Sequence, residues 1–181
     1  YELILIDDGS SDGTEFICDE LTVLDKRITV YHTDNKGVGA ARNLGIKKST
    51  GTYICFIDAD DYVDNTFLEK LYSAIKSNNA GLSVCGYYEI KEGNCKNYLF
   101  KEKHSSDCFY DVLTNDVLCV LWNKLFVREN IKHLFDENIL TSEDSIFCAR
   151  YYFDNIPKIA YVEEILYGYT VYNDGLSSNY Q

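Results

Sequence analysis

The sequence predicts a single α/β domain with a mostly parallel central sheet flanked by helices, and two observations lead to this prediction. Short apolar segments alternate with segments of helical periodicity in the first half of the chain, which is typical of β-α-β units. The chain has 181 residues, which is enough for the core of one domain and too short for a second full domain. We therefore expect one domain over residues 1–181, with a regular half up to about residue 90 and a less regular half over residues 91–181.

The elements of the first half follow from periodicity and from capping residues. Apolar runs predict four strands, Leu3–Ile6, Ile28–His32, Tyr53–Ile57 and Leu82–Cys85. Three helices are predicted between them, one from the capping residue Asp12 to Leu24, one from Gly37 to Ser49, and one that begins after Asp64 and extends through Ile75. The apolar residues that recur at helical spacing are Phe16, Ile17, Leu21 and Leu24 in the first helix and Phe67, Leu68, Leu71, Tyr72 and Ile75 in the third.

The second half shows weaker patterns. Its predicted elements are paired strands at Tyr87–Lys91 and Tyr98–Lys101, helices at Asp111–Leu121 and Glu143–Phe153, and closing strands at Lys158–Val162 and Leu166–Tyr172. We see no internal repeat or linker that would divide the chain.

Composition and charge exclude several classes of protein. The net charge of −12 argues against nucleic acid as a partner, because binding a nucleic acid backbone requires a basic surface. No apolar run approaches the roughly 20 residues of a membrane-spanning helix, so we expect a cytoplasmic protein, or one that works at the inner face of the membrane. The seven cysteines show no C-x-x-C pair and the three histidines show no metal-ligand spacing, which predicts reduced thiols and no zinc site.

Two groups of aspartates follow predicted strands. Asp7 and Asp8 come after the first strand, and Asp58, Asp60 and Asp61 come after the third. Because parallel sheets bind ligands beyond the carboxyl ends of their strands, both groups face one crevice if these strands are neighbours.

The simplest role of an aspartate after a strand is to cap the next helix, and Asp64 is well placed for this role. One cap is enough, so Asp58 and Asp60 are left without a structural task. Crowded carboxylates call for a cation or for raised pKa values, and oxygen ligands suit Mg²⁺ or Mn²⁺ bridging to a phosphate. Such a cation would also offset the repulsion between these carboxylates and a diphosphate ligand.

Four segments resemble, in order along the chain, the motifs of glycosyltransferase family 2. They are LIDDGSSDGT at residues 5–14, NKGVGAARNLGIKKSTGTYICFIDADD at 35–61, WNKLF at 122–126 and SEDSIF at 142–147. The resemblance implies an inverting enzyme with the GT-A fold. It also implies a strand and loop before Tyr1 that this sequence does not include, and we expect a chain without them to bind its donor weakly or not at all.

Matching the motifs residue by residue implies roles in a donor site. Asp8 has the position that binds the nucleotide base, with Asp7 beside it, and Arg42 matches the basic residue that contacts the nucleotide. Asp58 and Asp60 match the D-x-D pair, in which Asp58 lies near the ribose and the metal and Asp60 is the direct metal ligand. The metal that the resemblance implies is Mg²⁺ or Mn²⁺.

The resemblance places the catalytic base in the second half of the chain. Asp144, in the pair Glu143–Asp144, matches the base, and Trp122 and Lys124 match residues that line the site near the acceptor and the donor. An inverting transfer needs a base to take the proton of the attacking hydroxyl. The alternative for Glu143 and Asp144 is a structural role at the amino end of a helix, where the macrodipole favours carboxylates.

The implied reaction is the transfer of a sugar, with inversion, from a nucleotide-diphosphate donor to an acceptor hydroxyl. The resemblance favours a UDP-sugar as donor, a saccharide or lipid-linked saccharide as acceptor, and a role in the synthesis of bacterial surface polysaccharide. The sugar and the acceptor themselves cannot be read from the motifs, because a fold does not fix a substrate.

Three alternatives stay open. GVGAAR is similar to a dinucleotide-binding loop, but Arg42 stands where the third glycine belongs. FIDADDY resembles the nucleophile motif of haloacid dehalogenase-type phosphatases, but Tyr62 stands where that motif has Thr or Val. The third alternative is an inactive domain that only binds nucleotide sugars.

Overall fold

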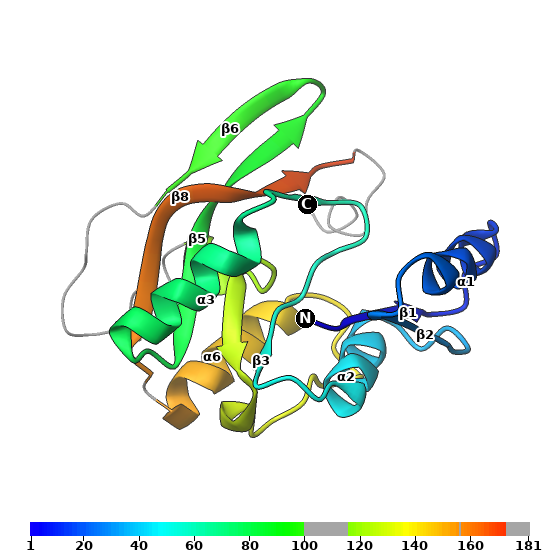
Figure 1. Ribbon diagram of the computed structural model, residues 1–181, viewed down its shortest axis with the longest axis horizontal. Helices are drawn as coiled ribbons and strands as arrows, with labels where there is room; N and C mark the ends of the chain where they lie inside the picture. Colours follow the sequence, from blue (N-terminus) through cyan, green and yellow to red (C-terminus); the bar gives the residue numbers. More distant parts are fainter. Residues whose placement is uncertain (100–115, 156, 173–181) are drawn as a thin grey trace.

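The computed structural model describes residues 1–99, 116–155 and 157–172, and the strands in these residues form two sheets (Figure 1). The small sheet is a parallel pair of β1 (Leu3–Asp7) and β2 (Ile28–His32). The large sheet has the order β3-β7-β5-β8-β4, with β6 paired to β5. Its strands are β3 (Tyr53–Ile54), β4 (Tyr62–Val63), β5 (Leu82–Lys91), β6 (Asn94–Tyr98), β7 (Lys124–Val127) and β8 (Ile159–Thr170).

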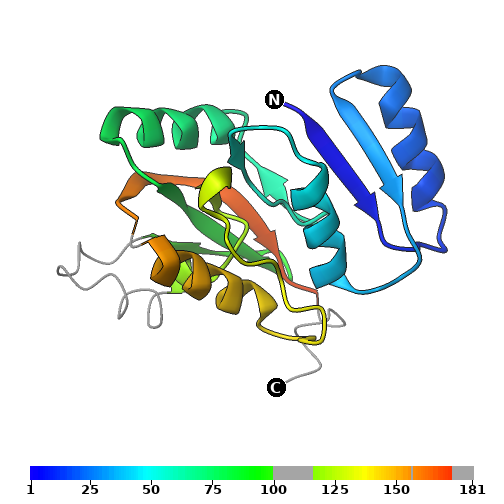
Figure 2. The same ribbon diagram turned by 90° about the horizontal axis from the view of Figure 1, so that it is seen from below.

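The helices pack on both sheets. They are α1 (Thr14–Leu24), α2 (Val38–Lys48), α3 (Phe67–Asn78), α5 (Asp116–Cys119), the 3₁₀ turn η1 (Arg128–Asn130) and α6 (Glu143–Asn155). Figure 2 shows α3 and α6 on opposite faces of the large sheet, α1 on the outer side of the small sheet, and α2 between the two sheets. Through α2, the small sheet is therefore attached to the rest of the domain.

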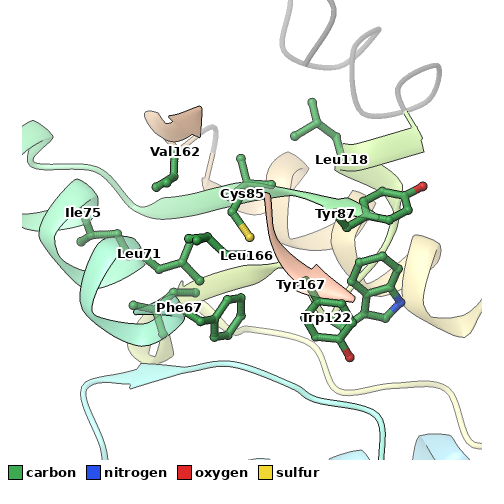
Figure 3. Packing of buried hydrophobic residues seen from close by; sticks show 12 residues of the cluster. Phe67, Leu71, Ile75, Cys85, Tyr87, Leu118, Trp122, Val162, Leu166 and Tyr167 are labelled. Atoms are coloured by element: carbon green, nitrogen blue, oxygen red, sulfur yellow. The ribbon is translucent and has the colours of Figure 1, made fainter. Parts of the chain in front are cut away.

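The core consists of two clusters of buried side chains. One lies between α3 and the large sheet and includes Phe67, Leu71, Val84, Trp122 and Tyr167 (Figure 3). The other lies against α6 and includes Ile46, Leu82, Phe126, Phe147 and Tyr151. Since Ile46 belongs to α2, the second cluster also joins that helix to the large sheet.

The α/β class is confirmed, but the prediction of a mostly parallel sheet needs correction because the large sheet is mixed. In the described residues, β5 and β8 pair in parallel, whereas β7, β6 and β4 each pair antiparallel with a neighbour. The reason is that β7, from the second half of the chain, lies between β3 and β5 and runs antiparallel to both. The β-α-β pattern of the first half predicted the elements correctly but not their neighbours.

The element boundaries agree best in the first half. β3 is shorter than predicted, because only two residues of β7 pair with it before the chain turns towards the acidic residues. The predicted strands Leu82–Cys85 and Tyr87–Lys91 form one strand, β5. The two predicted closing strands likewise form one strand, β8. β6 lies earlier than the predicted strand Tyr98–Lys101, and of the predicted helix Asp111–Leu121 the structure describes α5, residues 111–115 lying outside the described part.

The apolar residues of α1 are mostly exposed. Phe16, Ile17 and Leu24 are 68%, 61% and 79% exposed, and α1 has no buried residue. The small sheet has two strands, so it covers only the side of α1 that carries Cys18 and Leu21, which are half-buried. In α3, by contrast, Phe67, Leu71 and Ile75 are all buried on one face.

This difference predicts unequal costs for truncating leucines. Leu82 is fully buried in β5, so Leu82→Ala should lower the free energy of unfolding by about 2 to 5 kcal/mol through lost burial and a cavity. The matched change Leu24→Ala, on the exposed side of α1, should lower it by less than about 0.5 kcal/mol. Urea denaturation would measure both, and equal losses would contradict this description of the core.

Candidate functional site

Arg42 joins three segments that lie far apart in the sequence. It belongs to α2, and its Nη1 donates to Glu143 Oε1 at 2.5 Å while its Nη2 donates to Asp58 Oδ1 at 3.1 Å. The side chains of Arg42 and Glu143 are 13% and 11% exposed, so this bridge is largely shielded from water. It brings α2, the acidic loop of residues 58–61 and the amino end of α6 to one point.

The segment between η1 and α6 holds α2 in this place. The side chain of Asn43 is buried, its Oδ1 accepts a hydrogen bond from Phe135 N at 2.8 Å, and its Nδ2 donates to Phe135 O at 3.0 Å. The Phe135 ring stacks on the Phe147 ring of α6, with 4.2 Å between the ring centroids. The guanidinium of Arg42 lies over the Phe135 ring. One aromatic residue thus fixes the distance between α2 and α6.

Three contacts anchor the acidic loop to β8. Asp61 Oδ2 accepts from the Tyr167 hydroxyl at 2.6 Å, and Asp61 Oδ1 accepts from Thr170 N at 2.8 Å. The Tyr167 oxygen in turn accepts from Asp58 N at 3.2 Å. Burial, together with the nearby negative charges of Asp58 and Asp60, raises the pKa of Asp61 to about 6 in spite of its two hydrogen bonds. Asp60 itself is exposed.

Asp144 lies beside this bridge in the first turn of α6. Its Oδ1 accepts a hydrogen bond from Ser145 N at 2.7 Å. Burial is the main cause that raises the pKa of the Asp144 carboxyl, and the negative charge of Glu143 acts in the same direction. A carboxylate with a raised pKa is a stronger base than an ordinary aspartate, which suits a group that must accept a proton.

Asp8 and Asp7 point to opposite sides of the chain and have different partners. Asp8 accepts hydrogen bonds from Gly37 N at 2.7 Å and Lys36 N at 3.0 Å, so it holds the start of α2. Gly37 has a φ of 91°, a value that favours glycine there. Asp7 is buried and accepts from Ser10 N at 3.0 Å, and it pairs with His32 Nδ1 at 2.8 Å. These contacts lie within the small sheet and the turn that follows β1, away from Arg42.

Lys124 and Trp122 lie in the core beside the site, whereas the sequence suggested that they line it. Lys124 is fully buried, and its Nζ donates to Val120 O and to Asn123 Oδ1. This burial lowers the pKa of Lys124, although the charge of Asp144 favours its protonated form. Trp122 is 5% exposed and stacks on two tyrosines of β8. Their predicted contacts with donor and acceptor stay predictions.

Sequence reasoning did not single out the residues that support the site. Phe135, Thr170 and Tyr167 lie outside the four motif segments, and Asn43 lies inside the second segment, which implies no role for it. The roles of all four come from contacts with residues far away in the chain. The one available signal is the composition, because the chain has 16 tyrosines in 181 residues and a buried tyrosine usually directs its hydroxyl to a polar partner.

The profile of glycosyl transferase family 2 matches residues 1–151, which include Asp8, Arg42, Asp58 and Glu143. The chain belongs to glycosyl transferase family 2. This membership argues against the phosphatase and dinucleotide-binding alternatives, since the segments that suggested them lie inside the matched region.

Curated relatives of this family 2 chain come from several bacteria. An uncharacterized glycosyltransferase, EpsJ of Bacillus subtilis, is 30% identical over 93% of the chain and 52% of its own length. Glycosyltransferase GlyA of Streptococcus pneumoniae is 28% identical over 97% of the chain and 27% of its own length. The cholesterol galactosyltransferase of Borreliella burgdorferi is 28% identical over 92% of the chain and 51% of its own length. The chain therefore spans about half or less of these relatives.

Solved structures share the fold. TarS from S. aureus in complex with UDP-GlcNAc superposes with a TM-score of 0.80 at 21% identity, covering 99% of this chain and 52% of TarS. Mannosyltransferase PcManGT from Pyrobaculum calidifontis, in complex with GDP-Man and Mn²⁺, superposes with a TM-score of 0.67 at 16% identity, covering 97% of this chain and 49% of that protein. The GT-A-like fold is confirmed by these matches. None of the helices in the described residues combines the length and apolar character needed to cross a membrane.

The acidic loop fits a divalent cation that brings most of its ligands with the substrate. No group of three or more His, Cys, Asp or Glu side chains that could enclose a metal occurs in the described residues. The loop instead offers the exposed carboxylate of Asp60 and the half-buried carboxylate of Asp58. Mg²⁺ in phosphate-binding sites is commonly held by one or two carboxylates plus phosphate and water oxygens, which matches this small donor set.

The Arg42 bridge should contribute strongly to stability. Arg42→Met leaves the carboxylates of Asp58 and Glu143 partly buried without their shared cation, so we expect a loss on the order of 3 kcal/mol in the free energy of unfolding. Arg27→Met, which breaks an exposed pair with Asp25, is the matched control and should leave the free energy of unfolding nearly unchanged, because exposed ion pairs contribute little. Chemical denaturation measures both; a small loss for Arg42→Met would mean that the bridge is not formed in solution.

The small sheet should respond to pH through His32. Hydrogen bonds with Asp7 and then Asp19 raise the pKa of His32 above its ordinary value of 6.5. Its contribution to stability is therefore fully present below about pH 6.5 and is lost as the pH rises through the raised pKa. The free energy of unfolding of the native chain should exceed that of His32→Gln at pH 5, and the difference should shrink by pH 9. A difference that grows with pH would contradict the pairing.

Proposed function

We propose that this domain transfers a sugar, with inversion, from a nucleotide-diphosphate donor to an acceptor hydroxyl. The observation that carries the proposal is the Arg42 bridge, which joins the predicted metal and ribose loop at Asp58 to the helix that begins with Glu143 and Asp144. Donor and base residues of one reaction must lie within a few ångströms of the same substrate. The bridge supports this, because it ties both groups to one guanidinium.

The donor end of the site consists of the acidic loop and Arg42. Two carboxylates near a diphosphate would repel it, so binding requires a cation, which we propose is Mg²⁺ or Mn²⁺ held by Asp60 with Asp58 beside it. When bound, that cation supplies positive charge that offsets the negative charge on the leaving diphosphate. Besides joining the acidic loop to α6, Arg42 keeps the Asp58 carboxylate oriented. It also adds a positive charge beside the donor.

The acceptor end of the site contains the base. Asp144 accepts the proton of the acceptor hydroxyl as that oxygen attacks the anomeric carbon from the face opposite the diphosphate. Its burial favours this step, because a buried carboxylate is less well solvated and holds a proton more tightly. Glu143 supports this arrangement, because its hydrogen bond keeps Arg42 of α2 beside the first turn of α6, which carries Asp144.

We further propose a UDP-sugar as donor and a saccharide or lipid-linked saccharide as acceptor. The fold is shared with TarS bound to UDP-GlcNAc and with PcManGT bound to GDP-Man, so UDP and GDP donors are the first to test. These relatives are bacterial, and one of them carries the name cholesterol galactosyltransferase, so a sterol is a further acceptor to test beside saccharides. A role in bacterial surface polysaccharide synthesis, in the cytoplasm at the inner face of the membrane, is part of the same proposal.

The direct test is binding followed by turnover. UDP, GDP and their common sugar conjugates would be screened with and without Mn²⁺ by thermal denaturation, where a ligand at about 100 times its Kd adds ~2.7 kcal/mol of stability. Nucleotides that stabilise the protein would then be tested as sugar conjugates for release of the nucleoside diphosphate with candidate acceptors. Binding without release would support the inactive alternative. Absence of any Mn²⁺-dependent stabilisation in the full-length protein would overturn the proposal.

Two substitutions separate the proposed roles. Asp60→Asn should abolish Mn²⁺-dependent binding of the donor, because the exposed carboxylate of the loop is lost. Asp144→Asn should leave donor binding close to normal but slow transfer by about 10²- to 10⁴-fold, because the base is lost. Calorimetry with UDP and Mn²⁺ measures the first and product release the second. Equal loss of donor binding in both variants would contradict these roles.

A further inference from the structure

Tyr167 is a fully buried residue of β8 that reaches the acidic loop with its hydroxyl. The hydroxyl donates to Asp61 Oδ2 at 2.6 Å and its oxygen accepts from Asp58 N at 3.2 Å. It therefore contacts both ends of the loop of residues 58–61. The two bonds are different in kind, since one holds a side chain and the other holds the backbone.

Other contacts of the loop are the bond from Arg42 to the Asp58 carboxylate and two bonds at Asp61. Asp61 N donates to Asp58 O at 3.1 Å, which closes a turn, and Thr170 N donates to Asp61 Oδ1 at 2.8 Å. Asp58 and Asp60 belong to this turn, so its backbone determines where both carboxylates point. Without the Tyr167 hydroxyl, the amide of Asp58 would lose its partner in β8.

Packing fixes the position of the Tyr167 ring before any ligand binds. The ring stacks on Trp122, with 4.4 Å between the ring centroids and an angle of 19° between the ring planes. Its centroid lies 6.0 Å from that of the Phe67 ring in α3. Figure 3 shows the Tyr167 and Trp122 rings side by side in the core. A ring held on two sides leaves its hydroxyl little freedom, so the hydroxyl is a rigid reference point for the loop.

We propose that Tyr167 is a positioning residue for the donor site: it fixes the acidic loop so that the carboxylates of Asp58 and Asp60 face the donor diphosphate and its cation. The inference rests on the proposed function and adds a core residue to it. Trp122 takes part indirectly, because it holds the ring of Tyr167 and not the substrate. Asp61 is the attachment point of the loop and not a cation ligand.

The test is removal of the Tyr167 hydroxyl alone. Tyr167→Phe keeps the ring on Trp122 but removes both bonds to the loop. Tyr151→Phe is the matched control, because Tyr151 is also buried and its hydroxyl bonds Gly81 O and Val127 N, away from the loop. Both variants lose buried hydrogen bonds, so a general loss of stability would appear in both.

Two measurements on these variants decide the question. Partners that orient metal-binding groups typically change metal affinity 10- to 100-fold when lost, so Tyr167→Phe should weaken Mn²⁺-dependent UDP binding by about that factor, and Tyr151→Phe should change it less than about twofold. Hydrogen exchange of the segment 56–63 should speed up at least about 10-fold in Tyr167→Phe and stay unchanged in Tyr151→Phe.

The exchange measurement needs no ligand, so it separates this inference from the proposed function. Unchanged exchange in Tyr167→Phe would overturn the positioning role, as would equal loss of UDP binding in both variants. If exchange is faster but the full-length protein binds no nucleotide, the anchoring of the loop by Tyr167 stands, whereas the donor site and the role of Tyr167 in it are overturned.

A second pair of variants separates positioning from ligation at Asp61. Asp61→Asn keeps an oxygen that can accept from Thr170 N, whereas Asp61→Ala removes both bonds to β8. If Asp61 only attaches the loop, Asp61→Asn should bind Mn²⁺ and UDP within about threefold of the native protein, and Asp61→Ala should lose as much affinity as Tyr167→Phe. A loss in Asp61→Asn as large as in Asp60→Asn would show that Asp61 is a ligand.

Discussion

The site depends on a single guanidinium that is shared by carboxylates from two distant segments. In a chain with a net charge of −12, the carboxylates of Asp58 and Glu143 would repel each other without a cation between them, because like charges close together in a partly buried site are poorly screened. Arg42 is that cation, because it is bonded to both. The other supporting contacts, from Asn43 and Phe135, keep α2 and therefore Arg42 at the required distance from α6.

Local patterns predicted much of the fold, and the contacts between distant segments account for the rest. Helices α2, α3 and α6 and strands β1 and β2 follow from spacing and from breaks in the pattern. The predicted cap of α3 is wrong by two residues: the N-cap is Thr66, which makes no side-chain cap bond, and Asp64 accepts a hydrogen bond from Thr66 N in the turn before it. β7 has only four residues and no alternation that distinguishes it from a loop. Since β7 lies between β3 and β5, missing it led to the wrong expectation of a mostly parallel sheet.

The site shows the same division. Motif matching selected Arg42, Asp58 and Glu143, and the structure brings these three together. Motifs do not say which way a side chain points. Asp7 and Asp8 are consecutive residues at a strand end, so their side chains face opposite sides. As a result, Asp7 pairs with His32, and Asp8 accepts a hydrogen bond from Gly37 N at the start of α2. In WNKLF, Lys124 begins a short strand inside the core, so its ammonium is buried in spite of its place in a motif.

The central position of β5 determines when this chain can fold. β5 lies between β7 and β8, and its residue Leu82 pairs with Ile159, far later in the sequence. During synthesis, β5 and the apolar face of α3 therefore leave the ribosome well before the strand that completes their sheet. Long-range pairings of this kind slow folding and leave apolar surface uncovered meanwhile. The nascent chain is thus exposed to aggregation until Thr170 has emerged, and a chaperone that binds apolar segments would protect it over that interval.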